Sequence, residues 1–127
     1  MLYDRSKTII PSVLLQSQIA LFACCDSRVE PAFLFNSLPG EIFTVRNIAN
    51  LIPHFDASDH ATLSALEYSV NILKIKDIVV LGHSSCGGIH ALLEPMEQHE
   101  YVNKWLFNMS QAREKTLKAF EGLELLT

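Results

Sequence analysis

Short apolar runs alternate along the chain with stretches in which apolar residues recur at helical spacing. Runs of this kind are typical of strands buried in a sheet, and the sequence has them at Ile19–Cys24 and Ile78–Leu81. Ile42–Val45 is expected to be a further short strand, with Phe43 and Val45 on one face. Helices are expected between and after these strands, at Val29–Phe35, Leu63–Leu73, Gly87–Leu93 and Val102–Phe120. Ser64 and Glu67 match a capping box in the second of them. Strands that alternate with helices predict an α/β fold, in which a mainly parallel sheet carries helices on its faces.

The composition describes one folded domain. The chain has 127 residues and a mass of 14.2 kDa, which suits a single hydrophobic core, so residues 1–127 are expected to form one domain. Apolar residues make up 49% and charged residues 19%, which excludes an intrinsically disordered chain. The net charge of −4 implies no basic surface, so nucleic acid is not an expected partner.

No apolar run is long enough to cross a membrane, because a spanning helix needs about 18 or more apolar residues. Two basic residues, Arg5 and Lys7, precede the apolar stretch Ile9–Leu15. Pro11 and Ser12 interrupt that stretch, which disfavours a secretion signal. The protein is therefore expected to be cytoplasmic, with no membrane partner.

Two polar segments directly follow predicted strands, Cys24–Arg28 (CCDSR) and His83–Gly88 (HSSCGG). The carboxyl ends of parallel strands lie at one edge of a sheet, where ligands bind, so the two segments are expected to converge. Together they offer a carboxylate, an imidazole and three thiols, from Asp26, His83, Cys24, Cys25 and Cys86. Two thiolates and an imidazole suit Zn²⁺, and three protein ligands with a free fourth position describe a catalytic zinc site.

The same segments resemble a known family. CxDSR at 24–28 and HxxCG at 83–87 resemble the two signature motifs of the β-class carbonic anhydrases. VRNIAN at 45–50 and SALEY at 64–68 resemble the segments between those motifs, and the resemblance runs from about residue 21 to residue 105. It implies a three-layer α/β fold and the reversible hydration of CO₂ to bicarbonate and a proton through zinc-bound hydroxide.

The resemblance also implies roles for individual residues. Zinc would be held by Cys24, His83 and Cys86, with Cys25 a bystander. Arg28 would hold Asp26 away from the metal and orient its carboxylate to accept the proton of the zinc-bound hydroxide. If that pair breaks, Asp26 becomes the fourth zinc ligand in a closed state, and the sequence leaves both arrangements open. Four further positions resemble the substrate-binding ones: Phe43, Ile48 and Tyr68 for a CO₂ pocket and the Gly87 backbone N–H for bicarbonate.

Family members form dimers whose active-site cleft lies at the subunit interface, so the resemblance implies a homodimer or a higher homo-oligomer. The apolar N-terminal residues fit burial against a partner better than exposure, and the mean hydropathy of +0.20 agrees with a covered apolar surface. Relative to the family, both ends look altered or missing, and the usual C-terminal strand is lacking. A natural short form, a fragment and a decayed gene product are the alternatives.

Two other functions compete with an active enzyme. The first is a catalytically inactive zinc-binding homologue or fragment with a role in assembly or regulation. The second is a thiol-redox protein that uses Cys24 and Cys25. Adjacent cysteines form a strained disulfide and the chain has no Cys-x-x-Cys motif, so the redox function is disfavoured.

Overall fold

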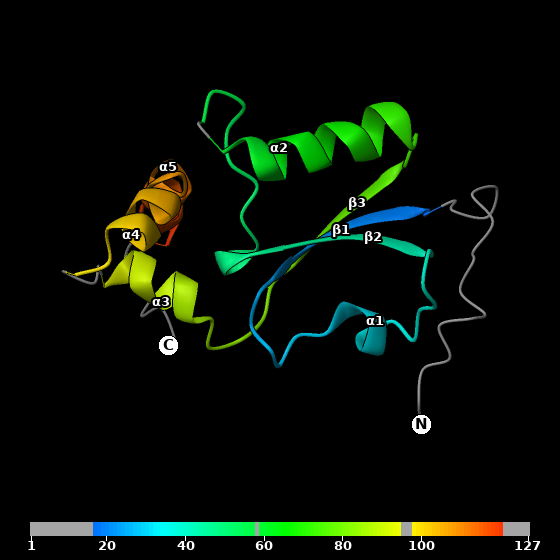
Figure 1. Ribbon diagram of the computed structural model, residues 1–127. Coiled ribbons are helices and arrows are strands. Elements are labelled where there is room, and N and C mark those ends of the chain that lie inside the picture. The colour runs from blue at the N-terminus through cyan, green and yellow to red at the C-terminus, as the bar shows by residue number, and fades with distance from the viewer. Residues whose placement is uncertain (1–16, 58, 95–97, 121–127) are drawn as a thin grey trace.

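A computed structural model of the chain describes residues 17–57, 59–94 and 98–120 (Figure 1). The strands are β1 (Ile19–Cys24), β2 (Ile42–Asn47) and β3 (Asp77–Leu81). The α-helices are α1 (Pro31–Leu34), α2 (His60–Glu67), α3 (Gly87–Leu93), α4 (Glu100–Phe107) and α5 (Ser110–Ala119). A short 3₁₀ turn, Ile48–Asn50, follows β2, and a π-helical turn, Tyr68–Ile72, continues α2.

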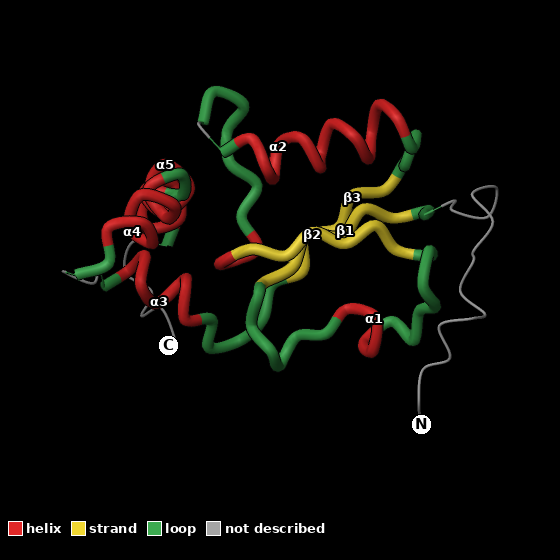
Figure 2. Tube along the Cα trace, in the orientation of Figure 1, coloured by secondary structure: helices red, strands yellow, loops and turns green. Residues whose placement is uncertain are grey.

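The three strands of the described chain pair in parallel in the order β2-β1-β3, with β1 in the centre. Helix α2 lies over one face of the sheet and the short helix α1 over the other (Figures 1 and 2). Helices α3, α4 and α5 lie together beyond the carboxyl ends of the strands (Figure 1). The predicted three-layer α/β fold with a parallel sheet is therefore confirmed.

Two apolar clusters form the core. The cluster under α2 is built on Ala20, Phe22 and Ile75, against which Phe43 and Leu66 pack. The second cluster joins the strand ends to α3 and α4, and its buried members are Cys24, Ala49, Cys86, Ala91 and Leu106. Because two thiol residues belong to this second cluster, the packing of α3 and α4 also fixes the position of those thiols.

Strand β3 is less buried than its apolar sequence predicted. Ile78 is 44% and Val80 53% exposed, whereas residues 20–24 of β1 are all buried. The strand order explains the difference, because β1 has a neighbour on each side and β3 pairs with one strand in the described part of the chain. The expectation that β3 is a buried strand was wrong for this single chain.

Helix boundaries also differ from the sequence expectation in two places. Helix α2 starts with Asp59 as its N-cap, and the side chain of Ser64 donates to the Ala61 carbonyl inside the helix, so the predicted capping box does not form. The single helix expected over 102–120 is two helices, α4 and α5. Asn108 lies at the break, and its side-chain amide donates to the Trp105 carbonyl (2.8 Å), as Asn side chains do when they compete with helical hydrogen bonds.

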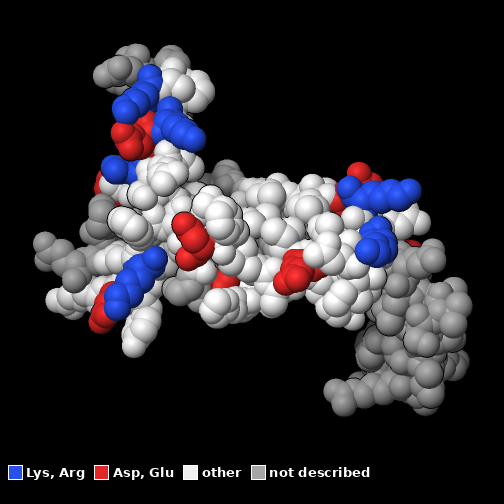
Figure 3. Space-filling view, turned by 90° about the horizontal axis from the view of Figure 1, so that it is seen from above, with Lys and Arg blue, Asp and Glu red and all other residues white. Residues whose placement is uncertain are grey.

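Charged side chains form separate groups on the face that carries α2 (Figure 3). Basic and acidic side chains lie together at the projecting end of the molecule in this view. Most of the surface between the two ends of this view is uncharged. Within the described ranges, no helix combines the length and the apolar character needed to cross a lipid bilayer.

Candidate metal centre

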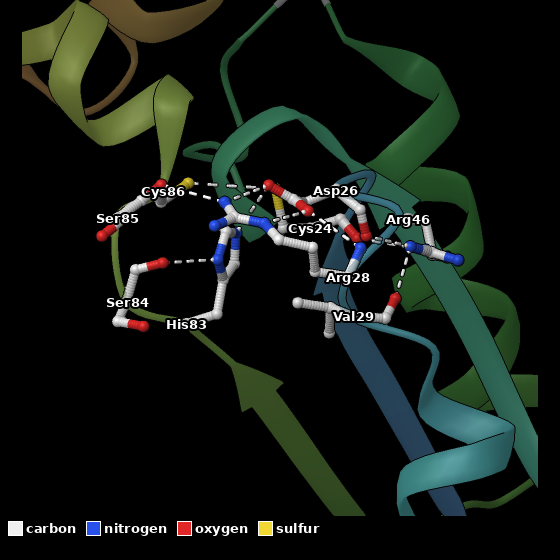
Figure 4. Close-up of polar contacts among 9 residues, drawn as sticks. All are labelled: Cys24, Asp26, Arg28, Val29, Arg46, His83, Ser84, Ser85 and Cys86. Atoms are coloured by element: carbon white, nitrogen blue, oxygen red, sulfur yellow. Dashed lines mark hydrogen bonds and ion pairs between the residues drawn. The ribbon is translucent and has the colours of Figure 1, made fainter.

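The two polar loops that follow β1 and β3 meet at the carboxyl edge of the sheet (Figure 4). Strand β1 ends at Cys24, its neighbour β3 ends at Leu81, and Cys86 directly precedes α3. One donor atom from each of Cys24, His83 and Cys86 lies within 4.8 Å of the other two. The structure thus brings together the three residues that the sequence suggested as zinc ligands.

The distance between the two thiols distinguishes a metal site from a disulfide. The Sγ atoms of Cys24 and Cys86 are 3.9 Å apart, and both cysteines are free and buried. A disulfide requires about 2.05 Å between the sulfurs. Two thiolates on one tetrahedral zinc, each about 2.3 Å from the metal, lie about 3.8 Å apart. The observed spacing therefore fits two sulfurs on one metal ion.

His83 presents a free ring nitrogen to the thiols. Its Nδ1 lies 2.9 Å from the Ser84 carbonyl oxygen, and because a carbonyl only accepts, Nδ1 carries the proton. The opposite nitrogen, Nε2, is the one buried side-chain polar atom of the described residues without a hydrogen bond. Buried polar atoms normally have partners, and metal-bound histidines typically use this arrangement. The donor set of His83, Cys24 and Cys86 therefore fits zinc.

The surroundings of Cys24 favour its thiolate. Burial opposes ionisation of this thiol, but a hydrogen bond from the backbone of Asp26, the adjacent His83 ring and a hydrogen bond from the backbone of Ala49 outweigh it, so the pKa of Cys24 falls from 9.0 to about 7. The Cys24 side chain in turn raises the pKa of His83. Because a metal binds the thiolate and not the thiol, a lowered thiol pKa makes this ligand available near neutral pH.

Asp26 and Arg28 form a bidentate ion pair beside these donors. Arg28 Nε lies 2.9 Å from Asp26 Oδ1 and Arg28 Nη2 lies 2.7 Å from Oδ2. Arg28 Nη2 also donates to the Ser85 carbonyl (3.1 Å), which ties the two loops together. The Arg28 side chain and its backbone N–H hold the pKa of Asp26 well below its usual range. Asp26 Oδ2 is 4.0 Å from His83 Nε2, so an ionised carboxylate stands next to the site but is held by arginine.

An open cleft of about 510 Å³ adjoins Cys24 and Asp26. Its remaining lining residues are mostly small or apolar: Cys25, Ile48, Gly87, Gly88, Ala91 and Val102. Of the four residues suggested for substrate binding, Ile48 and Gly87 lie at this cleft. The Asp26 carboxylate, the thiol of Cys24 and a largely apolar cleft therefore lie next to one another.

Comparison with known proteins places this site in a family. Residues 19–124 match the family described as carbonic anhydrase, and the chain is 42% identical over 99 residues to β-carbonic anhydrase 5, chloroplastic, of Arabidopsis thaliana. The chain belongs to the β-carbonic anhydrases. The alignment covers 76% of this chain and 33% of the Arabidopsis protein.

Solved structures of β-carbonic anhydrases share the fold. The β-carbonic anhydrase CcaA superposes with a TM-score of 0.78 at 34% identity, over 84% of this chain and 53% of CcaA. A tetrameric β-carbonic anhydrase of Sordaria macrospora gives a TM-score of 0.72 at 30% identity, over 85% of this chain and 53% of that one. The chain therefore spans a third of the Arabidopsis protein and about half of each of these structures.

Two of the suggested substrate-binding residues lie away from the cleft of this β-carbonic anhydrase chain. Phe43 and Tyr68 stack on each other, with ring centroids 6.2 Å apart, and Phe43 packs in the cluster under α2. Neither residue lines the cleft next to Cys24. A single chain thus does not bring them to the metal centre, and their place in a pocket shared between two chains stays a prediction.

Sequence reasoning missed the contacts that support the cleft wall. The indole Nε1 of Trp105, on α4, donates to the Ile48 carbonyl (2.9 Å). The next residue, Ala49, is fully buried with a positive φ of 63°. The Asn47 side chain fixes this turn, since it accepts from the Leu51 N–H (2.8 Å) and donates to the Leu51 carbonyl (2.7 Å). The sequence pattern placed Trp105 on the apolar face of a helix and gave no sign of this hydrogen bond. The one signal that could have indicated a role was that the family resemblance extends to residue 105.

Proposed function

We propose that the chain is a zinc-dependent carbonic anhydrase that interconverts CO₂ and bicarbonate. The observation that carries the proposal is the group of Cys24, His83 and Cys86, in which both cysteines are buried and His83 Nε2 has no hydrogen-bond partner. The adjacent ion pair of Asp26 and Arg28 supplies a carboxylate at the same place. Membership of the carbonic anhydrase family supports this function.

The reaction adds water to CO₂ and releases a proton. When bound, zinc supplies a Lewis acid that lowers the pKa of a coordinated water to near neutrality. Asp26 would accept a hydrogen bond from that water and orient it, because its carboxylate stays ionised and Arg28 leaves it oriented but off the metal. The apolar wall at Ile48 would admit uncharged CO₂, and the backbone N–H of Gly87, on the cleft lining, would contact bicarbonate.

The test is CO₂ hydration by the zinc-loaded 127-residue chain at alkaline pH, followed by stopped-flow with a pH indicator. We expect one Zn²⁺ per chain and hydration well above that of the zinc-free chain. His83→Ala should lose the metal and the activity. Cys25→Ser is the matched control, because Cys25 is exposed and outside the donor group, and it should retain both. Zinc bound without hydration would favour the inactive homologue instead.

We also propose that the chain works as a homodimer or a higher homo-oligomer. The described residues leave several large apolar side chains at least half exposed: Phe33, Leu34, Phe35, Leu38 and Val80. The tetrameric enzyme of Sordaria macrospora agrees with a self-associating family. The apolar N-terminal segment that was expected to meet the partner lies outside the described residues. Analytical ultracentrifugation at micromolar concentration decides the matter, and a zinc-bound, well-folded monomer would refute association.

A further inference from the structure

Arg46 on β2 reaches across the loop that follows β1 (Figure 4). It stands beside Ala23 in the strand register. Its Nε donates to the carbonyl of Cys24 (3.0 Å), and its Nη2 donates to the carbonyls of Asp26 (2.8 Å) and Val29 (2.5 Å). One side chain thus binds three main-chain oxygens of the loop that holds the candidate metal ligand Cys24 and the carboxylate of Asp26.

The shape of the guanidinium group matters for these contacts. Its N–H donors spread from a rigid plane, so one group can bind acceptors at the start, the middle and the end of the loop. The Arg46 side chain is 28% exposed, and its remaining contact is an ion pair with the more exposed Glu30 (3.0 Å). A lysine would keep the charge but offers its donors from a single nitrogen. Arg46→Lys therefore separates geometry from charge.

Apart from the contacts of Arg28 with Asp26 and Ser85, two main-chain hydrogen bonds also support the loop. The N–H of Cys25 donates to the Asn47 carbonyl (2.9 Å), and the N–H of Val29 donates to the Asp26 carbonyl (3.0 Å). The Asp26 carbonyl therefore accepts from both Val29 and Arg46. These bonds and those of Arg46 together fix the main chain on either side of the Asp26 side chain.

We propose that Arg46 is a positioning residue that holds loop 24–29 in its metal-binding conformation before the metal binds. This inference rests on the proposed zinc function, and it assigns Arg46 no contact with substrate. A site that is already ordered binds its ligand without the cost of ordering the loop. Loss of the three carbonyl contacts should therefore weaken metal binding while the sheet stays folded.

The first experiment measures zinc affinity by competition with a chromophoric chelator. Arg46→Lys should bind zinc about tenfold more weakly or worse, the size usual for losing support around a metal ligand. Arg113→Lys, on the exposed helix α5, is the matched control and should not change the affinity. Glu30→Gln removes the exposed ion pair but keeps the carbonyl contacts, so its affinity should stay within about twofold. Unchanged affinity in Arg46→Lys, or an equal loss in Glu30→Gln, would overturn the proposal.

The second experiment measures amide hydrogen exchange in the zinc-free protein and separates positioning from general destabilisation. In Arg46→Lys the amides of Cys25 and Val29 should exchange about tenfold faster or more, while the amides of β1 stay protected. An equal increase in the exchange rates of the loop amides and the β1 amides would contradict a positioning role for Arg46.

The unaltered chain gives an answer even if Arg46→Lys fails to fold. Protection of the Cys25 and Val29 amides without zinc supports the proposal, and protection that appears only with zinc overturns it. A chain that binds no zinc would refute the proposed function, yet the exchange measurement would still test Arg46.

Discussion

Gly88 sits where α3 touches the turn after β2, and a methyl group there has no room. A Cβ at Gly88 would lie 2.9 Å from Ala49 Cβ, 2.9 Å from Ile48 Cγ2 and 3.2 Å from the Ala49 nitrogen. Ala49 is fully buried and has a positive φ, so it has little freedom to move. Gly88→Ala should therefore push α3 away from the cleft wall.

The neighbouring glycine provides the comparison. A Cβ at Gly87 would meet no atom within 4 Å, and both glycines belong to α3. Replacing a helical glycine by alanine stabilises a helix by roughly 0.5–1 kcal/mol, and overpacking costs about 1–3 kcal/mol. Since the helical gain is common to both variants, Gly88→Ala should be less stable than Gly87→Ala by about 1–3 kcal/mol.

Urea unfolding of the zinc-free variants at one protein concentration measures this difference. Gly88→Ala should unfold at lower urea than the unaltered chain, and Gly87→Ala should not. Because Gly88 and Ile48 both line the cleft, Gly88→Ala should also weaken zinc binding. Equal stability of the two variants would show that α3 does not pack on the Ile48–Asn50 turn as described.

Three more predictions concern the metal centre and its support. The pKa of Cys24, lowered to about 7, should appear as the midpoint of its alkylation in the zinc-free chain, resolved by mass spectrometry. A lowered thiol pKa stabilises the folded chain fully above pH 9.0, and this stabilisation is lost as the pH falls through about 7. The free energy of unfolding of the zinc-free chain should therefore decline between these two pH values. An alkylation midpoint near pH 9.0 would be contrary evidence. Arg28→Ala should keep zinc but lose hydration, because it frees Asp26 to ligate the metal, and full activity would refute the role of Arg28. Trp105→Phe should cost about 1 kcal/mol in urea unfolding through the lost hydrogen bond to Ile48, and an unchanged unfolding midpoint would argue against that bond.

The elements and the donor group were predictable because their signals are local. The apolar run of β1 predicted Ile19–Cys24 with the same bounds, and the glycines after Cys86 predicted where α3 begins. The His83-x-x-Cys86 spacing predicted that one turn supplies two donors. Because the carboxyl ends of parallel strands lie at one edge of a sheet, Cys24 was expected beside them. Here local pattern and general topology were sufficient.

Other features depend on contacts that no local pattern encodes. The half-exposed residues of β3 follow from the strand order, which an apolar run does not reveal. The contact of Arg46 with Cys24 joins residues 22 positions apart, and that of Trp105 with Ile48 joins residues 57 positions apart. The break between α4 and α5 depends on the side chain of Asn108 turning back to the Trp105 carbonyl, which competes with an otherwise continuous apolar helical pattern.

Zinc X-ray absorption of the loaded 127-residue chain tests the metal centre most directly. Two sulfur neighbours at about 2.3 Å and one nitrogen at about 2.0–2.1 Å, with a further light atom completing four ligands, is the predicted result. Cys24→Ser should remove one of the two sulfurs or the metal itself. A zinc shell of nitrogen and oxygen alone, or one that keeps both sulfurs in Cys24→Ser, would contradict a centre built from Cys24, His83 and Cys86.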